Sequence, residues 1–335
     1  MEMVFERLTD NDLGEFRDFC REHWPGEHPL IHNEQMFEYY YRDPDSGINF
    51  TAAREKDSRD IHSVLGFIKA NSTANPDVWT SYILTKKGSE MGLGFKLLDF
   101  VQKLTNARTM ASNNIRKKTR ALYEFLGWYV GDQTQYYRLN EDVEKYTMCN
   151  IVDKKILFVA DDEKNFEFRK IDDKKGLEGF DFVALSQNKP YKDRAYFEKR
   201  FLDNPWIKYE VYEARNSAGP SALVVVRQFE HKKAVALRVV EYVGRTADIA
   251  GCGGFLDRLI KERGADFCDW FAFGAGDGTM LKAGFVPRTD EDPNTIPFYL
   301  SPPVMENVTM SFFTSDSEGY TMFRADGDQD RPNLG

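Results

Sequence analysis

The chain has 335 residues, of which 41% are hydrophobic and 14% aromatic, so it exceeds the usual size of one hydrophobic core and two domains are predicted. Its net charge of −9 excludes the broad positive surface that binding to a nucleic-acid backbone requires. We therefore expect no nucleic acid as a partner.

The N-terminal segment 1–16 carries acidic side chains where a signal peptide would carry positive charge and an apolar stretch. No uncharged apolar run approaches the ~18 residues of a membrane span. The four cysteines are widely spaced without a CxxC pair, which favours buried or idle thiols over a zinc site or a disulfide framework. We expect a cytoplasmic protein with no membrane partner and no bound metal.

The first half begins with a short strand and then a helix over 11–24, with Thr9 or Asp10 as its N-cap. A second helix is predicted over 33–42, ending before Pro44. Three strands rich in β-branched and aromatic residues follow, at 48–55, 61–70 and 78–85. After the glycine turn come a helix over 93–104, a short strand over 107–112, a helix over 114–126 and a final strand pair over 128–140.

The second half repeats this order of predicted elements. It begins with a strand over 166–171 and two helical segments over 174–182 and 191–201. Three strands follow, over 207–215, 221–229 and 234–244, and then a glycine-bearing turn with its helix over 248–264 and a strand over 266–274. Aligning Gly127-Trp128 with Gly284-Phe285 places Tyr123 opposite Met280. An internal repeat predicts two similar domains, 1–145 and 146–335, each with a mixed, mostly antiparallel sheet flanked by helices. The fold class is α+β (mixed α/β).

The stretch "KKGSEMGLGFKLLDF", 86–100, places two closely spaced glycines between a strand and a helix. Such a turn directs backbone N–H groups and the positive end of the helix dipole outward, which suits an anion. Gly92 and Gly94 lack the side chains that would keep a phosphate away from those groups. The alternative is a plain glycine turn that packs the helix on the sheet.

The glycine turn together with "ALYEFLGW", 121–128, resembles the GNAT superfamily of acyl-CoA-dependent N-acyltransferases. Ser89 stands where that family's diphosphate loop has Gln or Arg. Lys86 and Lys87 are candidates for the missing positive charge, and a solvated lysine pair is the alternative. The resemblance implies two GNAT-like domains, the first binding CoA and the second, degenerate one completing the acceptor cleft.

The resemblance further implies that backbone N–H groups from Met91 to Phe95 hold the diphosphate of acetyl-CoA, or of another short acyl-CoA. The preceding strand would pair its edge with the pantetheine amides. The family's asparagine position holds Arg116, so Asn113 and Asn114 are candidates for that contact. The expected cofactor-binding residues are Ile83, Leu84, Thr85, Lys86, Met91, Gly92, Leu93, Gly94, Phe95 and Asn114.

By the same resemblance, Tyr123 would protonate the departing thiolate, because a phenol stays protonated at neutral pH. Its alternative role is a half-buried helix aromatic. The acceptor amine needs a carboxylate or imidazole as base, and we consider Glu241 and His28. Glu241 alternates with apolar neighbours in its strand, so a structural strand position is its alternative.

The segment 23–43 and the ending "RADGDQDRPN" look like parts of tandem GNAT-like proteins associated with bacterial polysaccharide and O-antigen biosynthesis. That similarity implies the amine of a nucleotide-linked amino sugar as acceptor. The acidic tail is expected either to be disordered or to dock beside the second sheet, because 307–313 and 319–327 have strand periodicity. The expected substrate-binding residues are Trp24, His32, Tyr39, Asp326, Asp328 and Arg331.

Two other functions are compatible with the sequence. A related tandem fold transfers amino acids from charged tRNA, but it needs a basic surface, which the charge of −9 opposes. The other is a non-catalytic module that binds acyl-CoA or a sugar, with Ser89 and the shifted asparagine as signs of decay. The oligomeric state, monomer or homodimer, stays open because periodicity does not locate an unpaired strand edge.

Overall fold

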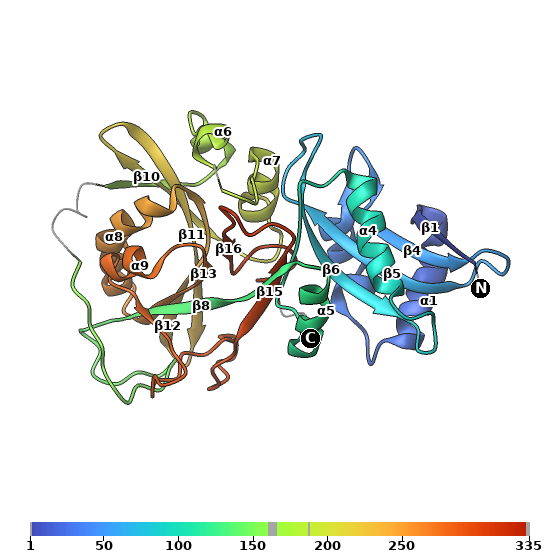
Figure 1. Cartoon of the computed structure of the whole chain (residues 1–335). Helices are drawn as coiled ribbons and strands as arrows, with labels where there is room; N and C mark the ends of the chain where they lie inside the picture. Colours follow the sequence, from blue (N-terminus) through green and yellow to red (C-terminus); the bar gives the residue numbers. More distant parts are fainter. Residues whose placement is uncertain (1, 160–165, 187, 333–335) are drawn as a thin grey trace. The chain divides into compact units, whose positions relative to one another are not determined.

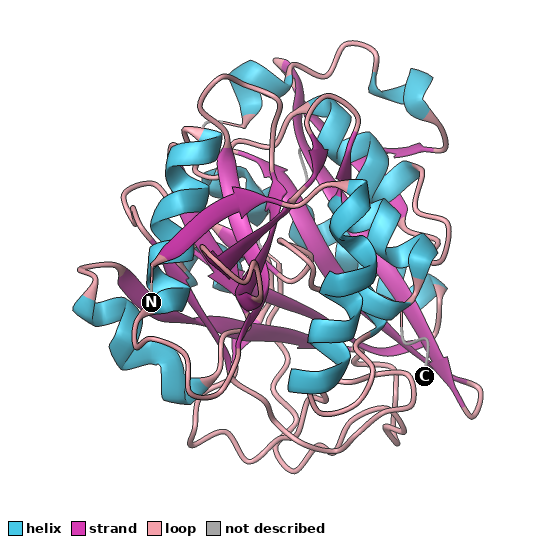
Figure 2. Cartoon of the chain, turned by 90° about the vertical axis from the view of Figure 1, so that its right-hand side faces the viewer, coloured by secondary structure: helices cyan, strands magenta, loops and turns pink. Residues whose placement is uncertain are grey.

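The computed structural model describes residues 2–159, 166–186 and 188–332, which form two compact units (Figure 1). Unit 1 ends at Asn113 and unit 2 begins at Asn114. Each unit contains a mixed, mostly antiparallel sheet with helices beside it (Figure 2). The predicted α+β class is confirmed.

Unit 1 contains one five-stranded sheet. In order across the sheet, its strands are β1 (Met3–Arg7), β4 (Phe50–Glu55), β5 (Ile61–Lys69), β6 (Asp77–Thr85) and β7 (Thr109–Asn113). All neighbours are antiparallel except β6 and β7, which are parallel. A separate hairpin pairs β2 (Arg42–Asp43) with β3 (Gly47–Ile48). The helices are η1 (Asp10–Asp12), α1 (Leu13–His23), α2 (Pro29–His32), α3 (Glu34–Tyr41) and α4 (Leu93–Thr105).

The helices of unit 1 follow from capping and apolar spacing. The Asn33 side chain accepts a hydrogen bond from the Met36 N–H at 3.0 Å and so caps α3, which lies within the helix predicted over 33–42. Helix α4 packs against β4, β5 and β6. Its buried residues recur at helical spacing and are Leu93, Leu97, Leu98 and Val101. The predicted helix over 93–104 is confirmed.

Unit 2 contains a seven-stranded sheet. In order across the sheet, its strands are β15 (Met310–Thr314), β8 (Tyr129–Leu139), β13 (Ala265–Phe273), β12 (Ala234–Gly244), β11 (Gly219–His231), β10 (Glu210–Asn216) and β9 (Glu167–Ile171). Two short strands lie off this path: β14 (Val286–Pro287) pairs with β8, and β16 (Met322–Phe323) pairs with β13. The helices are η2 (Lys117–Thr119), α5 (Arg120–Phe125), η4 (Lys174–Leu177), α6 (Phe182–Leu185), α7 (Arg194–Phe197), η5 (Glu198–Leu202), η6 (Thr246–Cys252), α8 (Gly253–Glu262) and α9 (Asp277–Lys282).

Several helices of unit 2 are shorter than predicted. The helix expected over 114–126 is a 3-10 turn followed by the six residues of α5. The segment expected as a helix over 191–201 is α7, which continues into a π-helical turn. These short elements have few apolar positions to repeat, so periodicity alone places their ends poorly.

The predicted repeat is confirmed by the sheet topology. In unit 2, the pairs β9–β10, β10–β11 and β11–β12 are antiparallel and the pair β12–β13 is parallel. Unit 1 shows the same order, with three antiparallel pairs from β1 to β6 and the parallel pair β6–β7. Helices α5 and α9 end in the same way, on Gly127 (φ 77°) and Gly284 (φ 81°) in the left-handed region. The Trp128 N–H bonds to the Tyr123 carbonyl at 3.1 Å, and the Phe285 N–H bonds to the Met280 carbonyl at 3.0 Å. The alignment of Tyr123 with Met280 therefore holds in three dimensions.

The division between the units differs from the expected domains 1–145 and 146–335. Strand β8 pairs with β13, β14 and β15, all of which come from the second half of the chain. Strand pairing therefore joins α5 and β8 to unit 2, although both were expected in the first domain. Tyr123 consequently belongs to unit 2.

Candidate functional site

Strand β6 contains a bulge that changes the direction of its backbone. Leu65 of β5 lies opposite Ile83 and Phe67 lies opposite Thr80, so β6 has one residue more than β5 between these pairs. The extra residue falls at Ser81-Tyr82. A bulge bends the strand that contains it and increases its twist.

At the same point β6 separates from β7. Their parallel pairing ends at Trp79 and Ala111, while β6 continues to Thr85. The described strands that pair with β6 are β5 and β7. The backbone of residues 81–85 therefore has an edge, here called the β6 edge, that no described strand covers. Backbone N–H and C=O groups on such an edge are ready to pair with an extended ligand.

The glycine turn connects this edge to α4. Gly92 has φ 83° and ψ 4°, and the Leu93 N–H approaches the Glu90 carbonyl at 3.4 Å. These values are those of a type II turn with Met91 and Gly92 at its centre. Among the described residues, the N–H groups of Met91, Gly92 and Gly94 have no hydrogen-bond acceptor. Three donors at a helix start thus stay available for an anion.

Gly94 determines how closely α4 approaches the strand. A Cβ added at Gly94 would lie 3.2 Å from the Ile83 Cδ1 and 3.7 Å from the Thr85 Oγ1. The structure therefore brings the predicted residues Ile83, Thr85 and Gly94 together, at the end of the β6 edge.

Two contacts that the sequence did not reveal hold the turn in place. The His62 Nδ1 lies 3.1 Å from the Ser89 hydroxyl, and the Lys86 N–H donates to the His62 carbonyl at 2.9 Å. Ser89, the residue that departs from the GNAT pattern, thus anchors the turn to β5. Met91 is 95% exposed, which leaves its N–H accessible.

An aromatic cluster surrounds the bulge. The Tyr82 ring lies 4.8 Å from Trp24 and 5.1 Å from His28, and the rings of Trp24 and His28 are 5.5 Å apart. The structure therefore brings the predicted residues Trp24 and His28 to the strand that carries the β6 edge. Tyr82 was not predicted, although the polar pair at 80–81 interrupts an otherwise apolar strand and indicates a bulge.

The other predicted substrate residues of unit 1 have different surroundings. Tyr39 packs edge-on against Tyr40 with ring centroids 5.0 Å apart, whereas the Tyr41 hydroxyl bonds Ser81 on the bulge at 2.7 Å. The His32 Nδ1 is buried and has no hydrogen-bond partner among the described residues. Burial lowers the pKa of His32, and the nearby Arg21 lowers it further, so the imidazole is neutral at pH 7.

Tyr123 is a buried aromatic of unit 2. It is 8% exposed, and its ring stacks on Phe313 of β15 at 4.0 Å and on Trp128 at 6.3 Å. Burial raises the pKa of Tyr123 to about 12, so the phenol keeps its proton at neutral pH. This is the state that a proton donor needs, and both interpretations of Tyr123 are compatible with it. Asn114, in the left-handed region at φ 61°, donates to the Gln329 side chain at 3.2 Å.

Glu241 and Asp326 lie in one buried ion cluster with Lys192. The Lys192 Nζ is 2.6 Å from the Glu241 Oε1 and 2.6 Å from the Asp326 Oδ1, and both carboxylates are fully buried. Burial lowers the pKa of Lys192, but the two carboxylates outweigh it and raise the pKa overall. Burial also raises the pKa of Glu241 to about 8, against the opposing effect of Lys192. Because Glu241 is fully buried and paired with Lys192, its surroundings do not support a role as the base for an incoming amine. Its catalytic role stays a prediction.

This cluster predicts a pH-dependent stability. The pKa of Glu241 is higher in the folded chain than its ordinary value of 4.5. The stability that protonated Glu241 contributes is therefore fully present below pH 4.5 and is lost as the pH rises through about 8. Glu241→Gln, which mimics the protonated carboxyl, should abolish this loss. Urea unfolding of both proteins between pH 5 and 9 measures the difference, and parallel pH profiles would contradict the assignment.

The predicted tail residues are ordered up to the end of the described chain. Asp328 is 8% exposed and accepts from Arg331 at 3.1 Å and from Gln329 at 2.8 Å. The Asp326 carboxylate pairs with the Lys192 Nζ at 2.6 Å and accepts a hydrogen bond from the Phe323 N–H at 2.9 Å, so both of its oxygens are engaged within the chain. Of the two expectations for the tail, docking beside the second sheet is the one that the structure confirms, because β16 pairs with β13. Asn333 lies outside the described residues.

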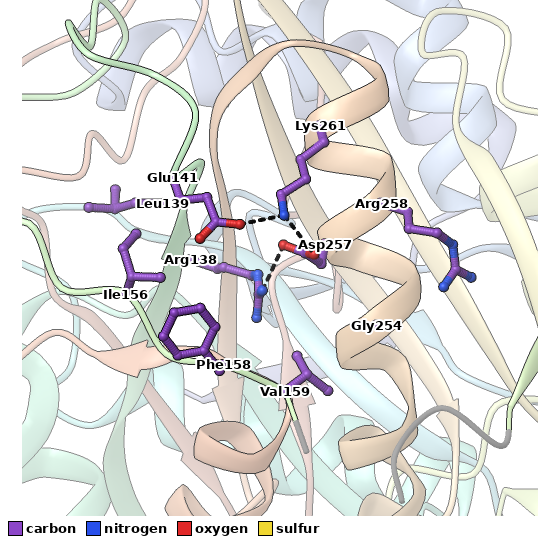
Figure 3. A pocket seen from close by; sticks show the side chains of 10 residues that line it. All are labelled: Arg138, Leu139, Glu141, Ile156, Phe158, Val159, Gly254, Asp257, Arg258 and Lys261. Carbon is purple, nitrogen blue, oxygen red and sulfur yellow. Dashed lines mark hydrogen bonds and ion pairs between the residues drawn. The ribbon is translucent and has the colours of Figure 1, made fainter. Parts of the chain in front are cut away.

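Unit 2 also contains a cavity of about 300 Å³ between α8, the end of β8 and the segment 156–159 (Figure 3). It is lined by Arg138, Leu139, Glu141, Ile156, Phe158, Val159, Gly254, Asp257, Arg258 and Lys261. Its charges are mostly paired with one another: Arg138 with Asp257 at 2.7 Å, and Lys261 with Glu141 at 2.5 Å and with Asp257 at 3.2 Å. None of the residues predicted from the sequence lines this cavity.

No described helix has both the length and the apolar character needed to cross a membrane. Within residues 2–159, 166–186 and 188–332, no group of three or more histidine, cysteine or acidic side chains is arranged to hold a metal ion. The four cysteines are buried free thiols, as expected.

Comparison with solved structures identifies the fold. A GCN5-related N-acetyltransferase from Anabaena variabilis superposes with a TM-score of 0.56 at 9% identity, covering 93% of this chain and 72% of that chain. One from Kribbella flavida has a TM-score of 0.55 at 11% identity, covering 93% and 70%. Comparisons of the sequence with protein-family models and with curated proteins find no match. At such identities the similarity establishes the fold, which is that of the GCN5-related N-acetyltransferases.

Proposed function

We propose that this chain, which has the fold of the GCN5-related N-acetyltransferases, is an N-acyltransferase that uses acetyl-CoA or another short acyl-CoA. The observation that carries the proposal is the uncovered β6 edge, which ends beside the glycine turn at the start of α4. The edge offers backbone groups to the pantetheine amides. The turn offers the N–H groups of Met91, Gly92 and Gly94 to the diphosphate.

In the proposed reaction the acceptor amine attacks the thioester carbon, the carbon–sulfur bond breaks, and the departing thiolate takes a proton. Tyr123 is the proposed donor, because its phenol stays protonated when burial raises its pKa. The amine must be neutral to attack, and His28 is the candidate base. The His28 ring lies 5.1 Å from the Tyr82 ring on the β6 bulge.

The proposed acceptor is the amine of a nucleotide-linked amino sugar in surface polysaccharide synthesis. Its physical support is the aromatic cluster of Trp24, His28 and Tyr82, since flat apolar faces with polar edges suit sugar rings and nucleobases. The class of acceptor is otherwise inferred from the resemblance of the segment 23–43. A thermal-shift screen of nucleotide amino sugars tests it, because a ligand at a hundred times its Kd adds about 2.7 kcal/mol of stability.

Met91→Pro tests the diphosphate site. Proline is favoured at the second position of a type II turn, so the turn should survive while one N–H donor is lost. A hydrogen bond to a charged group contributes ~1.5–3 kcal/mol, and the Kd for CoA should therefore rise roughly 10- to 100-fold by calorimetry.

Two controls sharpen this measurement. Met91→Ala removes the same exposed side chain but keeps the N–H, so its Kd for CoA should equal that of the unmodified chain. Pantetheine lacks the diphosphate and should bind equally to all three proteins. If Met91→Pro binds CoA with unchanged affinity, the diphosphate lies elsewhere and the proposal is wrong.

A further inference from the structure

Unit 2 repeats the geometry that leaves the β6 edge uncovered. Strand β12 has one residue more than β11 between Val239 and Glu241, which makes Val240 a bulge. The parallel pairing of β12 with β13 ends at Val239 and Trp270. The backbone of residues 240–244 beyond this point, here called the β12 edge, is the equivalent of the β6 edge.

In unit 2, however, the chain's own C-terminal segment fills this position. Strand β16 pairs with β13 through Phe323 opposite Ala272 and Met322 opposite Phe273. The Ala325 N–H then donates to the carbonyl of the bulge residue Val240 at 2.9 Å. The segment 322–326 thus forms backbone hydrogen bonds with both separated strands.

The side chains of this segment are built into the core. Met322, Phe323 and Ala325 are at most 1% exposed, and Phe323 packs with Trp270. The carboxylate of Asp326 is one of the two partners of the buried Lys192. Removing the segment would expose these apolar groups and leave a buried ammonium with one partner fewer.

Beside the nearby glycines of unit 2, protein atoms fill the space that a ligand would need. A Cβ at Gly274, just after β13, would lie 2.4 Å from the Tyr320 carbonyl oxygen, so this glycine gives the C-terminal segment room to pass. In η6, just before α8, a Cβ at Gly251 would lie 2.3 Å from the Phe166 ring, and at the first residue of α8 a Cβ at Gly253 would lie 2.7 Å from the Ala283 carbonyl oxygen. These two buried glycines are covered by protein atoms, unlike the exposed turn at Met91.

We infer that residues 322–326 permanently occupy the cofactor position of unit 2, where they take the place that an extended ligand takes on the β6 edge. Unit 2 therefore binds no acyl-CoA, and each chain binds one. The inference rests on the proposed function only in naming unit 1 as the unit that takes the cofactor.

Calorimetry of the full chain with CoA should give one binding event per chain. In Met91→Pro that event should weaken roughly 10-fold or more, with no residual event at the original affinity, whereas Met91→Ala should leave it unchanged. Two events per chain, or one event that Met91→Pro does not affect and that lowers the protection of residues 322–326 against amide exchange, would overturn the inference.

Amide hydrogen exchange tests the occupied β12 edge without relying on CoA binding. The Phe323 and Ala325 amides should exchange slowly in the free chain, and adding CoA should protect residues 86–97 while leaving 322–326 unchanged. Fast exchange of 322–326 in the free chain, or its loss of protection on adding CoA, would overturn the inference. A chain that binds no CoA but keeps 322–326 protected would instead reject the proposed function alone.

Discussion

Tyr123→Phe is expected to lower kcat by ~10²–10⁴-fold, the range that a positioned proton donor contributes. The substitution removes the phenol hydroxyl and keeps the ring, so its stacking on Phe313 at 4.0 Å and the fold should be retained. The Kd for CoA should not change, because no step of cofactor binding is assigned to the hydroxyl. Turnover with the amino sugar found in the ligand screen, together with calorimetry, measures both quantities.

Tyr129→Phe is the matched control. Tyr129, in the neighbouring strand β8, is 42% exposed and packs on Phe273 at 5.4 Å, and it has no proposed role in the reaction. This variant should keep its kcat. An unchanged kcat in Tyr123→Phe would remove Tyr123 from the mechanism, and tight CoA binding without any turnover would favour the non-catalytic module.

Lys192→Met is expected to destabilise the chain by ~3–5 kcal/mol, because it leaves the buried Asp326 carboxylate without the Lys192 cation and the buried Glu241 carboxyl without the Lys192 hydrogen bond. Both carboxylates are fully buried, and Lys192 itself is 2% exposed. Methionine keeps much of the side-chain volume, so the loss reports charge and not a cavity. Urea unfolding at pH 7 gives the difference in the free energy of unfolding.

Lys170→Met provides the comparison within the same unit. The Lys170 side chain is 43% exposed and pairs with Glu210 at 3.0 Å, and a surface pair contributes at most about 1 kcal/mol. Adding Asp326→Asn to Lys192→Met should recover part of the lost stability, since it removes the uncompensated carboxylate. Equal losses in Lys192→Met and Lys170→Met would show that the buried cluster is not held by its ammonium.

The local elements of unit 1 could be predicted because their signals lie within a few residues of one another. The cap at Asn33, the apolar spacing of α4 and the two glycines at 92 and 94 all depend on neighbouring positions. The repeat was likewise visible, because the order of elements recurs along the chain. The glycine turn and its exposed N–H donors therefore follow from the sequence itself.

Contacts between distant residues could not be predicted in the same way. No local pattern pairs β8 with β13, and this pairing moves Tyr123 into unit 2. Nothing around Lys192 indicates that it lies between Glu241 and Asp326, which are 49 and 134 residues away in the chain. Hydrophobic periodicity shows which face of a strand is buried, but it does not show which charges meet there.

The sequence by itself determined the class of fold, the internal repeat and the glycine turn before α4, because each depends on short-range spacing and backbone chemistry. The tertiary structure alone decided which edges are covered. The β6 edge is free of described strands, whereas the equivalent β12 edge is paired with a segment more than 80 residues away. The physical reason is that strand pairing satisfies backbone hydrogen bonds irrespective of side chains, so its partners are chosen by the packing of the whole unit.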